Sequence, residues 1–293
     1  MEPRTFGTSI ATPNSLAMYC ALELKVGSDC PSGPPWMSIS TGRLPVKAAG
    51  GRWISPVMVR PSKLFQRMIS VSLKVLVSML AGTADLSTAG TIEKAKFAES
   101  LGYDGHLIIP PWYQVHTMRE IDAHYRAVRE ATTKPIMIYN NPVDYKIDVT
   151  LDMFEELIEC SNITAVKEST RDVTNVTRLI NRFGTRLKIL CGVDTLAMEE
   201  LCLGADGWVA GLVCGFPKET VTIYNLVKAG KIAEAAAIYR WFMPLLHLDA
   251  EHDLVQSIKL AEQIMGRGSD RVRMPRMPLS GARREQVTAW VEQ

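Results

Sequence analysis

The chain has 293 residues, enough to bury one large hydrophobic core or two ordinary ones. Hydrophobic residues make up 47% and charged residues 22%, which is typical of soluble globular proteins and argues against a disordered or fibrous chain. A net charge of +2 argues against a nucleic-acid partner, and no apolar run reaches the roughly 18 residues of a membrane span. The cysteines and histidines have no disulfide or metal-ligand spacing, so we expect reduced thiols, no metal and a cytoplasmic protein without a membrane partner.

The charge is distributed unevenly along the chain. Residues 1–70 contain eight Lys or Arg, three acidic residues and eight of the sixteen prolines, a formal charge of +5. Residues 71–293 contain 25 basic and 28 acidic residues, a formal charge of −3. This break indicates that two stretches of different character are joined near residue 70.

From about residue 72 the hydrophobic pattern is regular. Short apolar runs predict buried strands at 74–81, 105–110, 134–139, 163–167, 187–191 and 207–211. Helical patterns follow these runs at 91–101, 118–131, 151–160, 172–182, 194–203 and from Pro217 onward. Further helices are expected at 231–247, 250–265 and 282–292. This alternation of strands and helices is typical of a parallel sheet that is buried on both faces.

Two architectures fit the alternation, an open doubly wound sheet and a closed eight-stranded barrel. No GxGxxG segment follows the first strand, which disfavours a dinucleotide-binding sheet. We therefore predict an α/β fold, a (β/α)8 TIM barrel with a C-terminal helical extension. An atypical segment at 1–70 occupies the place of strands one and two, 71–216 holds the recognisable barrel units, and 217–293 holds the last barrel helix and the C-terminal helices.

Active sites of such barrels lie at the carboxyl ends of the strands, where two residues stand out. Lys167 ends the strand 163–167, and burial there would disfavour the ammonium form and leave an imine-forming nucleophile. The alternative is a lysine that reaches solvent or pairs with Glu168, and the spacing does not choose between them. Tyr139 ends the preceding strand, where it would serve either as a proton relay or as a packing residue.

Other strand ends offer weaker candidates. Tyr113 follows a strand, and it would be either a site residue or an aromatic residue used in packing. Asp194 opens a helix and is most simply its N-cap, although that helix end would also face an anionic substrate. No GxSxG nucleophile elbow and no phosphate-binding P-loop occurs.

Together these segments resemble the dihydrodipicolinate synthase / N-acetylneuraminate lyase family over roughly residues 72–293. The resemblance rests on PPWY at 110–113, YNNP at 139–142, KES at 167–169, GVD at 192–194 and GWVAG at 207–211. It implies an eight-stranded barrel with C-terminal helices and a homotetramer.

The resemblance also implies a reaction. Lys167 would form a Schiff base with the keto carbon of pyruvate or another 2-oxo acid, and Tyr139 would relay protons there. A protonated imine is itself an electron sink, so no cofactor or metal is needed.

The remaining site residues follow from the same resemblance. Val209 would contribute a backbone group near the substrate carboxylate, and Tyr113 would reach into the site of a neighbouring subunit. Gly192 and Asp194 of the GVD segment are assigned to substrate binding.

Two departures from the family pattern define the hypothesis. The family's Gly-Thr-Thr-Gly-Glu motif should fall near residues 48–54, where no pair of hydroxyl residues occurs, so we hypothesise that residues 1 to about 70 are not native family sequence. Asp144 stands where the synthases place a carboxylate-binding arginine, and it would repel a carboxylate.

We therefore predict a Schiff-base lyase for aldol cleavage or condensation, dehydration or deamination. The alternative is a catalytically impaired barrel that acts as a scaffold or regulatory subunit.

Overall fold

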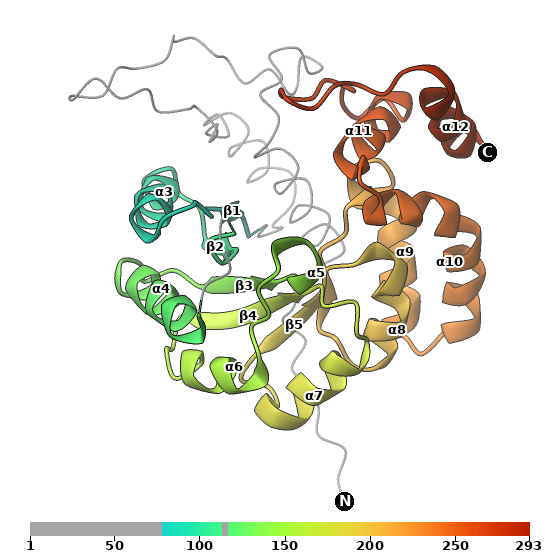
Figure 1. Cartoon of the computed structure of the whole chain (residues 1–293). Helices are drawn as coiled ribbons and strands as arrows, with labels where there is room; N and C mark the ends of the chain where they lie inside the picture. Colours follow the sequence, from blue (N-terminus) through green and yellow to red (C-terminus); the bar gives the residue numbers. More distant parts are fainter. Residues whose placement is uncertain (1–77, 113–116) are drawn as a thin grey trace, which may run out of the picture.

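The computed structural model describes residues 78–112 and 117–293 (Figure 1). Its strands form one parallel sheet in strictly consecutive order. They are β1 (Leu80–Gly82), β2 (Gly105–Ile108), β3 (Ile136–Asn140), β4 (Ile163–Glu168), β5 (Lys188–Cys191) and β6 (Gly207–Trp208). A doubly wound sheet reverses its strand order at a switch point, whereas a barrel winds in one direction, so the consecutive order of these six strands agrees with the barrel alternative and not with the doubly wound sheet. The two strands expected within 1–70 lie outside the described residues.

Helices follow the strands and cover one side of the sheet (Figure 1). They are α3 (Thr88–Ser100), α4 (Met118–Glu130), α6 (Leu151–Leu157), α7 (Thr174–Phe183), α8 (Ala197–Cys202) and α9 (Pro217–Lys228). A capping box starts α4, because the Thr117 hydroxyl accepts from the Glu120 backbone N–H and the Glu120 carboxylate accepts from the Thr117 N–H. The predicted order of strands and helices is thus observed from β1 to α9.

Element ends differ from the prediction in a few places. Strand β1 begins at Leu80, and most of the run predicted at 74–81 lies outside the described residues. Strand β6 ends at Trp208, because the chain bends there toward the short helix η3 (Leu212–Cys214). A one-turn helix that the sequence analysis did not predict, α5 (Pro142–Tyr145), follows β3.

The chain continues beyond the last strand as a group of helices. They are α10 (Ile232–Leu246), the short η4 (His247–Ala250), α11 (Leu254–Ile264) and α12 (Gly281–Glu292). Figure 1 shows α10 beside α9, with α11 and α12 on the same side of the molecule toward the C-terminus. The residues before α11 meet the sheet end closely, since a Cβ atom at Gly211 would lie 2.1 Å from Asp249 Oδ1.

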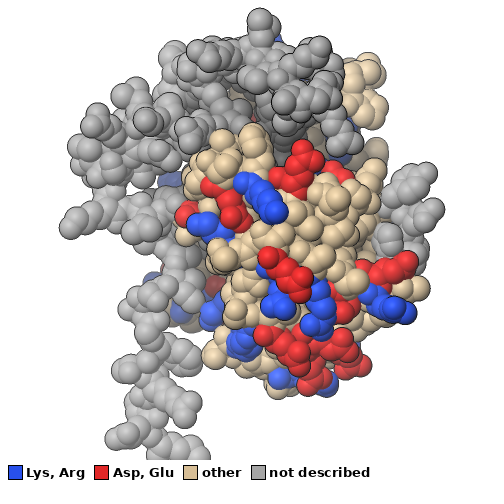
Figure 2. All heavy atoms as spheres, turned by 90° about the vertical axis from the view of Figure 1, so that its left-hand side faces the viewer, with Lys and Arg blue, Asp and Glu red and all other residues tan. Residues whose placement is uncertain are grey.

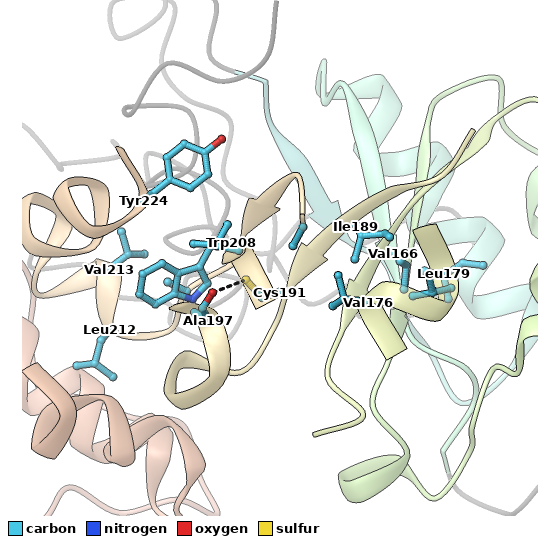
Figure 3. Close-up of a cluster of buried hydrophobic side chains, with 14 of the residues drawn as sticks. Val166, Val176, Leu179, Ile189, Cys191, Ala197, Trp208, Leu212, Val213 and Tyr224 are labelled. Atoms are coloured by element: carbon cyan, nitrogen blue, oxygen red, sulfur yellow. Dashed lines mark hydrogen bonds between the residues drawn. The ribbon is translucent and has the colours of Figure 1, made fainter. Parts of the chain in front are cut away.

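Alternate residues along β2 to β5 pack into two separate apolar clusters. The outer cluster lies between strands and helices and contains large buried side chains such as Phe154 and Trp208. Figure 3 shows its central part, where the Cys191 thiol donates to the Ala197 carbonyl oxygen at 3.7 Å. The inner cluster consists of Leu107, Met137, Tyr139, Ala165, Leu190 and Val209. Because the outer cluster is much the larger, it supplies most of the hydrophobic stabilisation.

Charged side chains of both signs share the outer surface. On the face formed by α3, α4 and α6, acidic and basic residues lie next to one another (Figure 2). Arg126, for example, is within 2.8 Å of Asp122 and 3.8 Å of Glu156. Within residues 78–112 and 117–293, no helix has the length and apolar character needed to cross a membrane.

Candidate active site

Tyr139 and Lys167 meet on the inner face of the sheet because their strands pair in register. Tyr139 of β3 and Lys167 of β4 are direct partners in this pairing. Their side chains are 9% and 4% exposed, and Lys167 Nζ lies 4.0 Å from the centre of the Tyr139 ring. The sheet thereby brings together the two residues that the sequence analysis ranked first.

The surroundings of Lys167 disagree with its solvent-exposed alternative, whereas its role as a nucleophile stays a prediction. A lysine that reaches solvent would be exposed, and this side chain is buried. Glu168 lies on the opposite face of the strand, where its carboxylate accepts from the Thr170 backbone N–H at 2.7 Å and from Asn175 Nδ2 at 2.9 Å. Lys167 is therefore a buried interior lysine, as the imine-forming interpretation requires.

Apolar side chains form the floor beneath this pair. Met137 and Ala165 precede Tyr139 and Lys167 on the same face of their strands, and Leu190 of β5 is the register partner of Lys167. Val209 is 3% exposed and belongs to this inner cluster, and its backbone N–H donates to the Cys191 carbonyl oxygen at 2.8 Å. A polar group at this site is therefore largely shielded from water on the side of the floor.

Asp194 differs from the expectation that it caps a helix. It is the first residue of the short helix η2 (Asp194–Leu196), the cap residue is Val193, and no side chain closes that helix end. The fully buried Asp194 carboxylate instead accepts from Trp208 Nε1 at 2.9 Å and from the backbone N–H groups of Gly211 and Leu212 at 3.1 and 2.9 Å. The N-cap prediction is wrong because donors far along the chain occupy this carboxylate.

The charge state of Asp194 reflects opposing effects. Burial raises the pKa of its carboxyl to about 6, while the hydrogen bonds from Leu212, Trp208 and Gly211 and the positive charge of Lys167 lower it. Because the same carboxylate fixes the chain on both sides of Val209, it sets the position of the Val209 backbone at the edge of the site.

Gly192 is a point of close approach at the end of β5. A Cβ atom there would lie 2.1 Å from Ser169 Oγ, 2.8 Å from Lys167 Cγ and 2.9 Å from the Glu168 carbonyl oxygen. Only a glycine leaves space for these neighbours. The Ser169 hydroxyl is buried and has no hydrogen-bond partner among the described residues. The sequence analysis missed Ser169 as a polar group beside Lys167, although its place two residues after Lys167 on the same strand face was the available signal.

A polar network that the sequence analysis also missed surrounds the Tyr139 hydroxyl. Asn141 is 5% exposed, and its Nδ2 lies 3.3 Å from Tyr139 Oη and 2.7 Å from Asp144 Oδ2. Arg171, from the loop after β4, places a guanidinium nitrogen 4.0 Å from Asp144 Oδ1. A cation from the neighbouring loop thus faces Asp144, while the expectation that Asp144 repels a substrate carboxylate stays a prediction.

Two buried carboxyls lie behind the site, on the outer face of the sheet. Burial raises the pKa of Glu168, and it raises the pKa of Glu200 in α8 to about 8. Both carboxylate oxygens of Glu200 are buried without a partner among the described residues. In the part of the chain that the structure describes, no group of three His, Cys, Asp or Glu side chains is placed to hold a metal ion.

Two expectations fall on residues outside the described part of the chain. These are the role of Tyr113 at a subunit boundary and the missing hydroxyl pair near residues 48–54.

Comparisons with known proteins agree with the fold described above. The model of the dihydrodipicolinate synthetase family matches residues 64–293. The 4-hydroxy-tetrahydrodipicolinate synthase of Geotalea daltonii is 31% identical over 72% of this chain and 73% of its own length.

Solved structures of similar fold come from the same group of proteins. The 4-hydroxy-tetrahydrodipicolinate synthase of Methylacidiphilum fumariolicum has a TM-score of 0.71 at 28% identity, covering 78% of this chain and 76% of its own. A chloride-inhibited dihydrodipicolinate synthase of Acinetobacter baumannii, solved in complex with pyruvate, has a TM-score of 0.72 at 27% identity and covers 78% of both chains.

Proposed function

Because the chain belongs to the dihydrodipicolinate synthetase family and is a lyase, we propose that it forms a Schiff base between Lys167 and pyruvate or another 2-oxo acid. The observation that carries this proposal is the position of Lys167 Nζ, buried on the inner face 4.0 Å from the ring centre of Tyr139. The pyruvate bound to the Acinetobacter baumannii relative supports the choice of substrate class.

The proposed chemistry uses the groups of the inner face. The neutral Lys167 amine attacks the keto carbon, and loss of water from the carbinolamine gives a protonated imine. Tyr139 gives a proton to the departing oxygen. The imine becomes an enamine when the carbon next to it loses a proton or a carbon substituent, and Tyr139 exchanges a proton with that carbon. The same enamine serves aldol cleavage, condensation, dehydration and deamination.

We assign binding of the 2-oxo acid carboxylate to the strand ends at Val209 and Gly192. Gly192 follows β5 next to Lys167, and Val209 follows β6 in the inner cluster. Asp194 contributes to substrate binding through its hold on the residues flanking Val209. The buried hydroxyl of Ser169 adds a polar group that a bound substrate can engage.

We further propose a homotetramer in which Tyr113 of one subunit completes the site of the next. This assembly follows the family resemblance, and a mass measurement in solution tests it. A monomer that is fully active would contradict it.

The test of the function is reductive trapping of the full chain with a panel of carbonyl compounds. Borohydride reduces an imine to a stable amine, so pyruvate should add the mass of one reduced pyruvate per chain. Acetone, which lacks the carboxylate, is the matched control and should give little adduct. If no 2-oxo acid gives an adduct, the chain is not a Schiff-base lyase and the scaffold alternative, favoured by the absent hydroxyl pair at 48–54, takes its place.

A further inference from the structure

The Asn141 side chain has a fixed orientation at the end of β3. Its Oδ1 accepts from the Asp144 backbone N–H at 3.1 Å, the bond that caps α5. The amide nitrogen must then face the other way, toward Tyr139 Oη at 3.3 Å and Asp144 Oδ2 at 2.7 Å. An amide nitrogen has two hydrogens, and these two acceptors account for both. The geometry therefore assigns Asn141 as a donor to the Tyr139 hydroxyl oxygen.

A donor at this oxygen has two consequences for the phenol. The hydroxyl hydrogen of Tyr139 must point away from Asn141, since that direction is filled by an N–H group. The hydrogen bond also favours the ionised phenolate, because it is stronger to a negative oxygen than to a neutral one. Both effects suit a group that gives up and takes back a proton.

The ring itself is held from two other sides. Lys167 Nζ lies over one face of the ring, and the Tyr145 ring from α5 meets it nearly edge-on, with centroids 5.7 Å apart and an interplanar angle of 78°. Asn141 thus fixes the hydroxyl end of a ring whose plane is already set.

The carboxylate of Asp144 holds the amide in place and is in turn faced by Arg171. Asp144 lies in α5 after β3 and Arg171 lies in the loop after β4, and Arg171 has a φ of 63°, a left-handed conformation that residues other than glycine rarely adopt. Such a conformation persists where the surroundings impose it, and it often marks functional sites. Arg171, Asp144 and Asn141 therefore form one connected network that ends on Tyr139.

We propose that Asn141, held by Asp144 and Arg171, is a positioning residue that sets the direction and ionisation of the Tyr139 hydroxyl. The catalytic consequence rests on the proposed function, since Tyr139 is the proton relay of the Schiff-base reaction. The effect on Tyr139 ionisation is independent of catalysis and can be measured without any substrate.

The first experiment measures the ionisation of Tyr139 directly in the full chain. Tyrosine labelled with ¹³C at Cζ is incorporated, and Tyr139→Phe identifies the Tyr139 signal by its disappearance. In Asn141→Leu, which has a similar volume but no donor, that signal should titrate at a pH higher by about one unit than in the unmodified chain. Asn181→Leu makes the same change at an exposed position of α7 and should leave the titration where it was.

The second experiment separates proton transfer from imine formation. Exchange of the methyl protons of pyruvate for deuterium requires the enamine, whereas the final extent of borohydride trapping reports the imine alone. We expect Asn141→Leu to slow exchange about tenfold, with an alkaline shift of its pH profile and unchanged trapping. Arg171→Gln, at the exposed end of the network, should act in the same direction by about two- to threefold and serves if Asn141→Leu does not fold.

The outcomes distinguish the two proposals. A Tyr139 titration that is the same in Asn141→Leu as in the unmodified chain would overturn the positioning role, whether or not pyruvate is trapped. Failure of the unmodified chain to trap any 2-oxo acid would overturn the proposed function, while a shifted Tyr139 titration would still support the role of Asn141.

Discussion

The inner face of the sheet and the C-terminal helices each bury a lysine, and the two lysines differ in the side chain that lies beside their Nζ atom. Lys259 in α11 is 6% exposed, and its Nζ lies 3.2 Å from the carboxylate of Glu262. Lys167 is 4% exposed and lies against the ring of Tyr139 above an apolar floor. The carboxylate makes Lys259 one half of a buried ion pair, whereas Lys167 lies beside a phenol that can give and take a proton. Burial alone therefore does not identify a nucleophile, whereas the side chain beside the amine distinguishes the two lysines.

The largest expected effect comes from removing the interior lysine. Lys167→Arg keeps a positive charge but cannot form an imine, so the pyruvate adduct should vanish and lyase turnover should fall by at least about a thousandfold. Mass spectrometry of the intact chain after borohydride treatment measures the adduct. An adduct of undiminished yield in this variant would show that another amine is the nucleophile.

Removing the other buried lysine should cost stability instead of chemistry. Lys259→Met leaves Glu262, whose side chain is 10% exposed, without its cation, at a cost of about 3 kcal/mol in the free energy of unfolding. Urea unfolding measures this cost, and pyruvate trapping should remain intact. Lys231→Met breaks a pair of the same spacing with Glu234 at the surface and should cost less than about 1 kcal/mol. Equal costs for the two variants would contradict the account.

The crowded floor of the interior site predicts a third contrast, between two glycines at strand ends. In Gly192→Ala the new methyl group would displace Ser169 and Lys167, and a displacement of about 1 Å at a reacting group lowers the rate about a hundredfold. In Gly82→Ala the new methyl group meets nothing within 4 Å, so the rate of imine formation should stay within about twofold. A stopped-flow or quench measurement of adduct formation compares the two, and equal rates would argue against close packing around Lys167.

The smallest effect concerns a buried acid outside the inner face. The pKa of Glu200 is raised by burial from its usual 4.5 to about 8, so the folded chain binds a proton that the unfolded chain has released at intermediate pH. The folded state is therefore destabilised progressively as pH rises from about 4.5 to about 8. Glu200→Gln removes this loss and should be more stable than the unmodified chain by about 2 kcal/mol at pH 9, with no advantage near pH 4.

Its control is a surface acid on another helix, changed in the same way. Glu285→Gln in α12 should not reproduce the gain in stability at pH 9. If Glu200→Gln also abolished the pyruvate adduct at neutral pH, Glu200 would belong to the site after all.

Much of the described fold could be predicted because it depends on local patterns. The apolar runs and the turns between them predict where β2 to β5 lie, and strand ends predict Tyr139 and Lys167 as neighbours. The family resemblance extends this prediction to the reaction, and the family match over residues 64–293 begins near the change in composition.

The unpredicted parts depend on contacts between distant residues. Asp194 looks like a helix cap in sequence, but its partners lie 14 to 18 residues away. The sequence likewise does not show that Arg171, from the loop after β4, lies beside Asp144. Asn141 is two residues after Tyr139, but the sequence does not show which way its amide points. The fold sets this direction, because in α5 the Asp144 backbone N–H donates to the amide oxygen and the Asp144 carboxylate accepts from the amide nitrogen.

One measurement decides which of the two buried lysines is the nucleophile. The full chain is incubated with pyruvate and borohydride and then digested, and the mass of each lysine-containing peptide is measured by mass spectrometry. The account predicts that the reduced pyruvate is found on Lys167, with Lys259 unmodified. An adduct on Lys259, or one spread over many lysines with no preference for Lys167, would contradict the assignment of Lys167 as the nucleophile.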